Sequence, residues 1–316
     1  MAPGNGSFVT QFILMGLTDQ PDLHLPLFFL FLGMYTVTVT GNLNLIILIL
    51  LNSHLHTPMY FFLFNLSFID LCYSSVFTPK MLINLSKKNI ISYMGCMTQQ
   101  FFFFLFFFFV ISEIYVLISM ASDRYVAVCN PLLHNVVMSP KVCSRLMFGS
   151  SLGSYLMAFS GAMAHTGCML RLTFCDASNI NHYFCDIHPL LQLSSTSTFI
   201  NELVVFFVAG INIIVPNIAI FVFYGLIFSN IFHISSTEGR SKALSTCSSH
   251  IIAVSLFFGS MSFMYLKPSS AGSMDDRRIS SVFCTNVVAM MNPLIYSFRN
   301  KDVKTALRKT VDGIQF

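Results

Sequence analysis

Residues 120–131 read MASDRYVAVCNP and place an acid and a base, Asp123 and Arg124, at the end of a long uncharged run. That run, residues 89–112, carries no charged side chain and includes eight phenylalanines. Charges beside such a segment are costly to bury unless they are paired or lie close to water. The pair is followed by Pro131, which cannot continue a helix. The stretch therefore predicts an acid–base pair that fastens the end of a helix at a membrane surface.

The composition agrees with a membrane protein. The chain has 316 residues, of which 55% are hydrophobic and 9% are charged, whereas soluble domains carry about 25% charged residues. A net charge of +4 without a basic block argues against a nucleic-acid partner. The nine cysteines form no CxxC pair, which argues against a zinc ribbon or a thioredoxin-like site.

Seven apolar segments are long enough to cross a bilayer, which takes about 20 residues. We therefore expect an all-α membrane protein, a seven-transmembrane helix bundle that forms a single domain over residues 1–316. Within it, 1–24 is an extracellular tail, 25–298 is the bundle and 299–316 is a cytoplasmic tail. The spans are expected near 25–51, 58–80, 97–122, 142–166, 199–231, 243–266 and 280–298.

The distribution of Lys and Arg predicts the orientation. Ten lie on the ends and loops on the side of Arg124 and seven on the other side, and the tail before the first span has none. The positive-inside rule then favours an extracellular N-terminus and puts the Asp123–Arg124 pair on the cytoplasmic face. Asn5 opens an Asn-Gly-Ser glycosylation sequon, which fits an extracellular start.

The segment after the last span, residues 299–310, is short, basic and amphipathic. Its apolar residues recur at helical spacing and its basic residues occupy the remaining surface. This pattern predicts a short helix that lies on the lipid of the inner leaflet, with a frayed basic tail as the alternative. The apolar residues are Val303, Ala306, Leu307 and Val311, and the basic residues are Lys304, Arg308 and Lys309.

Polar residues inside the apolar spans predict an interior network. Glu113 and Arg124 are eleven residues apart, close to three helical turns, so they share one face of the third span. Asp70 in the second span and Asn292 in the seventh could meet Glu113 at mid-membrane. Two interpretations stay open: a hydrated cluster that holds Na⁺ or a shared proton, and a hydrogen-bonded core without an ion.

The sixth span carries a second polar stripe, because Lys242, Thr246 and His250 repeat every four residues at its cytoplasmic end. A histidine in this position is either a switch or a satisfied core residue, and both interpretations stay open. The stripe belongs to the same face of the membrane as Arg124.

Three cysteines, Cys96, Cys175 and Cys185, are extracellular in this topology, where disulfides persist. A Cys96–Cys185 bridge would close a loop of roughly 90 residues and contribute about 4–5 kcal/mol in the chain-entropy model. It would also hold the loop over the mouth of the bundle. His182 and His188 flank Cys185, but we expect no metal site there.

Six motifs occur in a fixed order along these spans. They are Gly41-Asn42, residues 56–62 (HTPMYFF), 66–72 (LSFIDLC), 120–131, 242–247 (KALSTC) and 292–297 (NPLIYS). In these motifs the chain resembles the vertebrate olfactory receptors of the tetrapod type, within the rhodopsin-like G-protein-coupled receptors. The resemblance covers about residues 12–310, nearly the whole chain.

The resemblance implies an odorant receptor in the plasma membrane, a multi-pass protein that activates a heterotrimeric stimulatory G protein of the olfactory type and raises cyclic AMP. It implies a pocket in the outer half of the bundle, apolar with a few hydroxyl or amide groups, as suits a small volatile ligand. The candidate ligand-binding residues are Phe107, Val110, Ile111, Val208, Ala209, Asn212, Phe258, Met261, Ser262, Tyr265 and Thr285.

The resemblance also implies an activation switch in which Arg124, Tyr224 and His250 rearrange. The full set of implied switch and coupling residues is Asp123, Arg124, Tyr125, Tyr224, Lys242, His250, Asn292, Pro293 and Tyr296. The chain departs from the family in several places. Ser122 and Ala289 stand where the family has Tyr and Pro, Ser195 replaces the usual partner of Cys175, and about one extra turn falls in residues 101–109.

Three other classes compete with this interpretation. A seven-span transporter or channel would need a continuous polar path, which the aromatic outer half of the third span argues against. An enzyme is disfavoured because Asp70, Glu113 and Asp123 lie on separate levels without a nucleophile–base pair. A non-functional variant of the same fold is the third alternative, because of the extra turn.

Overall fold

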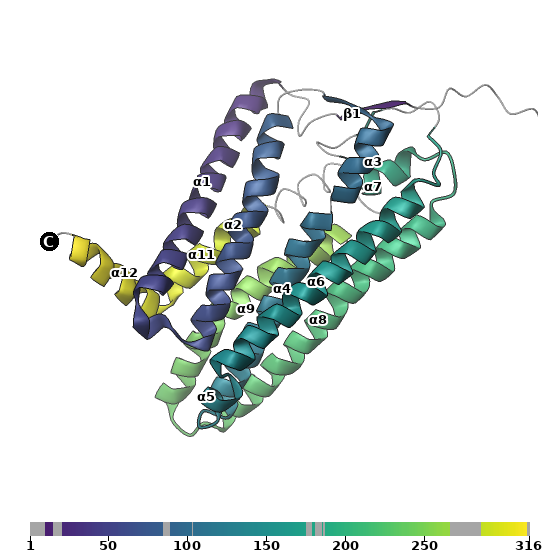
Figure 1. Cartoon of the computed structure of the whole chain (residues 1–316). Coiled ribbons are helices and arrows are strands. Elements are labelled where there is room, and N and C mark those ends of the chain that lie inside the picture. The colour runs from purple at the N-terminus through teal and green to yellow at the C-terminus, as the bar shows by residue number, and fades with distance from the viewer. Residues whose placement is uncertain are drawn as a thin grey trace, which may run out of the picture.

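The computed structural model describes residues 10–14, 21–84, 89–102, 104–174, 179–180, 185, 187–265 and 286–314. Long helices lie side by side in one bundle, with a small sheet at one end and a separate short helix, α12, at the other (Figure 1). We call these the sheet end and the α12 end of the bundle. The long helices are α1 (Pro21–Leu51), α2 (Pro58–Asn84), α3 (Tyr93–Phe102), α4 (Phe104–Cys129), α6 (Pro140–Met169), α8 (Phe199–His233), α9 (Thr237–Tyr265) and α11 (Val288–Arg299).

Shorter elements connect and cap the long helices. At the sheet end lie three strands and one short helix, and the other three elements lie at the α12 end. They are β1 (Gln11–Leu14), β2 (Asn89–Ser92), β3 (Asn179–Ile180), α7 (Ile187–Leu193), η1 (Ser53–Leu55), α5 (His134–Val137) and α12 (Lys301–Ile314).

Proline marks where several of these helices begin. Pro21, Pro58 and Pro140 are the first residues of α1, α2 and α6. Proline suits this position because its fixed φ is helical and the missing N–H would have no partner there. α4 ends at Cys129, two residues before Pro131, so that Asp123 and Arg124 lie in its last two turns. Most predicted span ends coincide with these bounds or lie a few residues inside them, whereas the predicted end at 266 lies one residue beyond α9 and the predicted start at 280 lies outside the described chain.

Five helical segments of the described chain are long and apolar enough to cross a membrane: Asp22–Leu51, Pro58–Ile83, Tyr93–Cys129, Phe199–His233 and Thr237–Ser262. The other two predicted spans correspond to α6 and α11. α6 has 30 residues and is less apolar because serine and glycine are frequent along it. α11 has 12 residues, and residues 266–285 lie outside the described chain.

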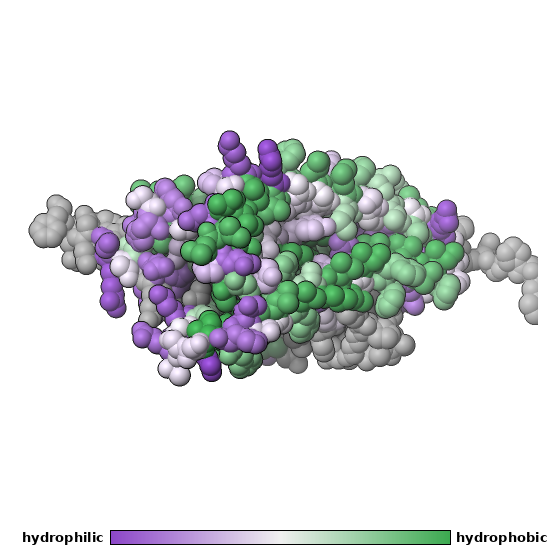
Figure 2. All heavy atoms as spheres, turned by 90° about the horizontal axis from the view of Figure 1, so that it is seen from below, coloured by the Kyte–Doolittle hydropathy of each residue, from purple (hydrophilic) through white to green (hydrophobic). Residues whose placement is uncertain are grey.

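The helices expose apolar side chains outward and bury polar ones. Phe221 and Phe148 are 76% and 72% exposed, whereas Asp70 is 1% exposed. Seen from below, hydrophobic residues cover the flank toward the sheet end and hydrophilic residues gather toward the α12 end (Figure 2). This inversion of the usual soluble pattern is what a lipid-facing bundle requires.

The N-terminal segment forms a strand, which the sequence analysis did not predict. β1 is the middle strand of the sheet, antiparallel to β2 and parallel to β3. The Phe12 side chain on β1 is fully buried and meets the ring of Phe174 edge-on at a centroid distance of 5.3 Å. β1 therefore ties the N-terminal segment to two loops that cover this end of the bundle.

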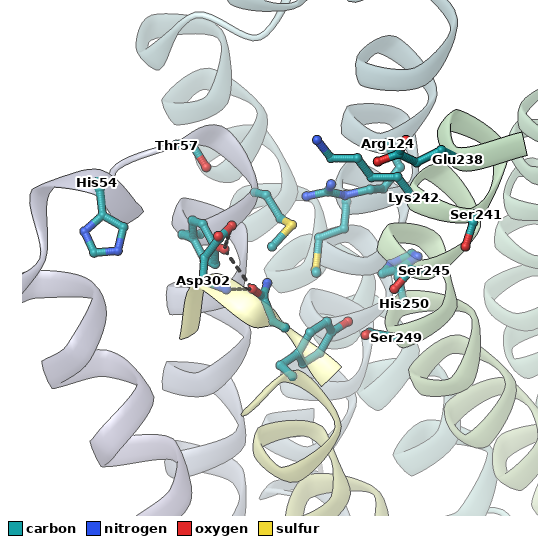
Figure 3. Close-up of a pocket in the computed structure, with 15 residues that line it drawn as sticks. His54, Thr57, Arg124, Glu238, Ser241, Lys242, Ser245, Ser249, His250 and Asp302 are labelled. Atoms are coloured by element: carbon teal, nitrogen blue, oxygen red, sulfur yellow. Dashed lines mark hydrogen bonds between the residues drawn. The ribbon is translucent and has the colours of Figure 1, made fainter. Parts of the chain in front are cut away.

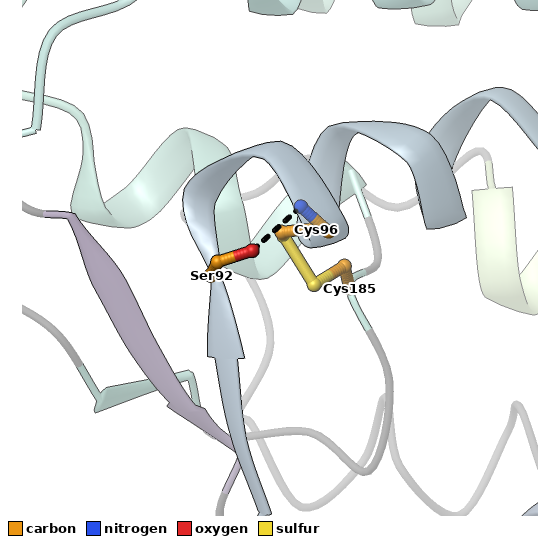
Figure 4. Close-up of a disulfide and its surroundings, with 4 residues drawn as sticks. Ser92, Cys96 and Cys185 are labelled. Carbon is orange, nitrogen blue, oxygen red and sulfur yellow. Dashed lines mark hydrogen bonds between the residues drawn. A yellow bond between two sulfur atoms is a disulfide. The ribbon is translucent and has the colours of Figure 1, made fainter.

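A disulfide lies beneath the sheet. It joins Cys96 of α3 to Cys185, with the Cα atoms 5.7 Å apart and a sequence separation of 89 (Figure 4). Both cysteines are fully buried in a cluster that includes Phe12, and Ser92 Oγ accepts a hydrogen bond from Gly95 N at 3.0 Å at the start of α3. The expected Cys96–Cys185 bridge is thus confirmed, while Cys175, His182 and Asn5 lie outside the described residues.

We expect Phe12→Ala to destabilise the receptor by roughly 3–5 kcal/mol, because it leaves a cavity beneath the sheet. The measurement is the midpoint temperature of unfolding of the detergent-solubilised protein. Ile90→Ala is the matched control, since Ile90 lies on the neighbouring strand β2 and is 69% exposed. Equal midpoints for the two variants would contradict the buried role of β1.

Candidate functional site

The contact between α1 and α11 depends on a glycine. A Cβ atom added at Gly41 would lie 3.1 Å from the Cβ and Cγ atoms of Pro293, so the two helices approach closely only because Gly41 lacks a side chain. Pro293 has no N–H, which leaves the carbonyl of Ala289 without its helical donor. The amide of Asn42 donates to this carbonyl at 3.4 Å and to Thr38 O at 3.0 Å. The Gly41-Asn42 motif of α1 and the Asn292-Pro293 motif of α11 therefore form one contact between the two helices.

The three polar residues that the sequence placed at mid-membrane do meet. Asn292 Nδ2 donates to Asp70 Oδ2 at 3.1 Å and to Glu113 Oε1 at 3.2 Å. All three side chains are buried, and the hydroxyl of Ser74 donates to the backbone carbonyl of Asp70. An amide nitrogen carries two hydrogens, so each carboxylate takes one of them. This polar core joins α2, α4 and α11.

α2 makes a second polar contact, with the segment just before α11, that was not predicted. Thr78 Oγ1 lies 2.9 Å from Asn286 Oδ1, two residues before α11, and both residues are buried. Asp70, Ser74 and Thr78 recur every four residues, and this spacing is the signal that would have found the contact.

A cavity of about 700 Å³ opens at the α12 end (Figure 3). Figure 3 shows the side chains of Arg124 and Lys242 extending into this space from α4 and α9. The cavity combines both charge signs with hydroxyl groups. Its lining residues are His54, Thr57, Met59, Tyr60, Met120, Arg124, Glu238, Ser241, Lys242, Ser245, Ser249, His250, Tyr296, Asn300 and Asp302.

The Asp123 carboxylate lies behind Arg124 and is 1% exposed. Its Oδ2 atom is 3.6 Å from Arg124 Nη2, so the expected pair is present. Its Oδ1 atom is 2.8 Å from Nε2 of His134, on the short helix α5. Sequence analysis missed His134, because it considered polar residues along the spans and not in the connections between them.

A second polar contact lies across the cavity. The Tyr224 hydroxyl and His250 Nδ1 form a hydrogen bond between α8 and α9, and the two rings stack with centroids 5.8 Å apart. His250 and Tyr296 are buried on the cavity wall. The ring of Tyr125 packs against Phe223 at 5.9 Å. The structure therefore gathers most of the predicted switch residues at the α12 end. Asn292 and Pro293 lie deeper in the bundle, where α11 contacts α1, α2 and α4.

α12 is anchored beside the cavity. Asn300 Oδ1 accepts hydrogen bonds from the backbone N–H groups of Asp302 and Val303 at 2.9 and 3.3 Å, which caps the helix. The Tyr60 hydroxyl lies 3.1 Å from both Asn300 Oδ1 and Asp302 Oδ2. Val303 and Ala306 are buried against the bundle, while Leu307 and three basic residues are exposed. The predicted amphipathic helix is confirmed. On its apolar face, Val303 and Ala306 pack against the bundle, whereas Leu307 is exposed.

The predicted ligand-binding residues lie toward the sheet end on α4, α8 and α9. Val110, Ile111, Phe258 and Met261 are buried, and Ser262 is half-buried. Of the remaining candidates, Thr285 lies outside the described chain, and the side chains of Ala209 and Tyr265 are not described.

Two candidates contact α6, which the sequence analysis left out of the site. The ring of Phe107 stacks on His165 of α6 with centroids 6.1 Å apart. Val208 lies opposite Gly161 of α6, where an added Cβ would be 3.5 Å from Val208 Cγ1. Asn212 Nδ2 donates to Val208 O at 2.7 Å. His165, which is buried, is thus a neighbour of the candidate pocket that sequence analysis missed.

Comparison with known proteins agrees with this geometry. The olfactory receptor family matches residues 31–312. The chain is 68% identical to olfactory receptor 8B3 of Homo sapiens over 316 residues, covering 100% of this chain and 98% of the relative. It is 67% identical to olfactory receptor 8B3 of Mus musculus (98% and 96% covered) and 66% identical to olfactory receptor 8B8 of Homo sapiens (100% of both). The chain therefore belongs to the olfactory receptor family, whose members are seven-transmembrane G-protein-coupled receptors and not enzymes.

Proposed function

We propose that this odorant receptor binds a small, mostly apolar volatile ligand toward the sheet end and activates a stimulatory G protein of the olfactory type through the cavity at the α12 end, raising cyclic AMP. The observation that carries the proposal is the position of Arg124. Its side chain is 11% exposed on the cavity wall and is attracted from behind by the buried Asp123. A cation held this weakly can exchange its internal partner for a protein that enters the cavity.

The orientation follows from the chemistry of the two ends. We propose that the sheet end, which carries the Cys96–Cys185 bridge, faces the outside of the plasma membrane, because disulfides persist in oxidising compartments. Asn5 precedes β1 and would be glycosylated on that side. The exposed Lys304, Arg308 and Lys309 of α12 then face the anionic inner leaflet.

α4 gives a physical route from ligand to G protein. Phe107 and Val110 lie toward one end of it, and Asp123 and Arg124 lie at the other. Between them, Glu113 is bonded through Asn292 to α2 and α11. A ligand that contacts α4 better in one position of the helix than in another shifts the population of states that present Arg124 to the cavity.

The candidate pocket favours neutral ligands. Its described side chains are mostly apolar, and none of the eleven candidates is an acid that would recognise an amine. Asn212 uses one amide hydrogen on Val208 O, so its second hydrogen and its oxygen remain for a ligand. We propose that the ligands are apolar molecules with one oxygen function, such as ketones, esters or alcohols.

The polar core has the chemistry for a cation or a proton. Asp70 and Glu113 each commit one oxygen to Asn292 and keep a second. Two buried carboxylates beside one neutral amide need positive charge nearby, and carboxylate oxygens suit a hard cation. We propose that these two side chains hold Na⁺ or a shared proton, which would hold α2, α4 and α11 in one arrangement.

Replacing Arg124 with alanine should abolish ligand-stimulated cyclic AMP without preventing delivery to the cell surface, since the residue lies on the cavity wall and not in the core. The measurement is a cyclic AMP reporter in cells exposed to a panel of volatile ketones, esters, alcohols and terpenes. Arg145→Ala, an exposed arginine on α6, is the matched control and should keep its response. Undiminished signalling by Arg124→Ala would refute the proposal.

Asn212→Ala should lower the potency of oxygen-bearing odorants about tenfold, the cost of one hydrogen bond, and leave hydrocarbon ligands unaffected. Dose–response curves for active members of the panel give the measurement. Asn217→Ala is the control, because Asn217 lies on the same helix and donates to Ile213 O at 2.8 Å in the same way. Equal losses for the two variants would show that Asn212 acts only on the helix.

Na⁺ in the polar core should lower agonist-free nucleotide exchange, because it stabilises the arrangement in which Asn292 bridges the two carboxylates. We expect exchange to rise when NaCl is replaced by choline chloride in receptor membranes with added G protein. Asp70→Asn should remove this difference, and Asp22→Asn, at an exposed acid in the first turn of α1, should retain it. The same exchange in both salts would favour the shared proton instead.

A further inference from the structure

Asp123 has two basic neighbours at unequal distances. His134 Nε2 is 2.8 Å from Oδ1, within hydrogen-bond range, whereas Arg124 Nη2 is 3.6 Å from Oδ2. The second distance exceeds that of a hydrogen bond, so Arg124 is attracted by charge alone. The hydrogen-bonded partner of this buried carboxylate is therefore the histidine on α5 and not the adjacent arginine.

His134 is placed to exchange protons with water. Its side chain is 20% exposed on α5, which joins α4 to α6, while the carboxylate it contacts is 1% exposed. α4 presents Asp123 and Arg124 to this contact. α6 presents the buried thiol of Cys143, which donates to Met138 O at 3.6 Å. Lys141 and Arg145, in the first two turns of α6, are exposed.

We propose that His134 is a positioning residue that competes with Arg124 for the carboxylate of Asp123, so that protonation of His134 releases Arg124 toward the cavity. The inference rests on the proposed function, in which Arg124 meets the G protein. Imidazole side chains change charge between about pH 5 and 8, a range that includes the cytosol. Coupling should therefore depend on cytosolic pH.

Two effects of protonation act in the same direction. A charged imidazole makes a charge-assisted hydrogen bond to the carboxylate, roughly twice as strong as a neutral one, and so neutralises the charge that attracts Arg124. It also repels the guanidinium directly. A fall in pH therefore weakens the hold on Arg124, which already lines the cavity with Lys242 and Glu238. Basal activity should rise as the pH falls.

The experiment measures agonist-free GTPγS binding in receptor membranes with added stimulatory G protein, between about pH 7.5 and 6.0. His134→Gln keeps a neutral N–H donor but cannot gain a proton, and His134→Tyr is a second neutral donor. His233→Gln is the matched control, because His233 is exposed at the end of α8 with Nδ1 2.6 Å from Ser229 O. Arg124→Ala sets the level without coupling.

We expect the ratio of wild-type exchange to His134→Gln exchange to rise about threefold or more toward the acid end, because only the wild type gains the charged bond. The ratio of wild type to His233→Gln should stay constant, which removes the pH dependence of the G protein itself. Normalisation to surface receptor at each pH removes differences in expression. A merely structural role for His134 would change the level of exchange and not its dependence on pH.

The inference is overturned if wild-type exchange, divided by that of His134→Gln or of His134→Tyr, does not change with pH in either case. The proposed function would remain intact. Wild-type exchange at the Arg124→Ala level at every pH would overturn the proposed function, and this inference with it. If neither neutral variant reaches the membrane, the wild type decides alone. The ratio of wild-type exchange to Arg124→Ala exchange must then rise toward pH 6.0. A ratio that exceeds one but stays flat overturns the inference.

Discussion

The amide of Asn292 is the interaction on which the bundle depends, because it bonds to two buried carboxylates from two other helices. Inside a membrane each polar group must find its partner within the protein, and an unpaired one costs several kcal/mol. The rotation of α2, α4 and α11 about their axes is therefore fixed by Asp70, Glu113 and Asn292 together. Once Glu113 is fixed, helical geometry places Arg124 on the same face at the α12 end.

The same requirement explains the α1 contact and the part of the fold that sequence analysis recovered. Pro293 frees a backbone carbonyl, and Asn42 supplies the donor, which is possible only because Gly41 allows close approach. The spans, the polar core, the Asp123–Arg124 pair and the amphipathic α12 were predictable because each follows from spacing along one helix or from the cost of burying charge. These rules need no knowledge of distant contacts.

The features that were missed depend on contacts between segments far apart in the chain. β1 has four residues and no periodic signal of its own, and it becomes a strand because β2 and β3 lie on either side of it. His134 lies in a connection whose position is set by where α4 and α6 end. The extra turn expected within residues 101–109 stays a prediction, because residue 103, between α3 and α4, lies outside the described chain.

The two ends of the bundle differ in what holds them together. The sheet end is fixed by a disulfide and three paired strands. At the α12 end, the Nε2 atom of His250 and the hydroxyl of Tyr296 are buried without a hydrogen-bond partner in the described chain, and Arg124 is 3.6 Å from its carboxylate. A buried polar group without a partner costs free energy. Regaining that free energy by pairing the group offsets part of the free-energy cost of a rearrangement. The α12 end, where we propose that a G protein enters, therefore has contacts that can rearrange, whereas the sheet end is tied by a covalent bond.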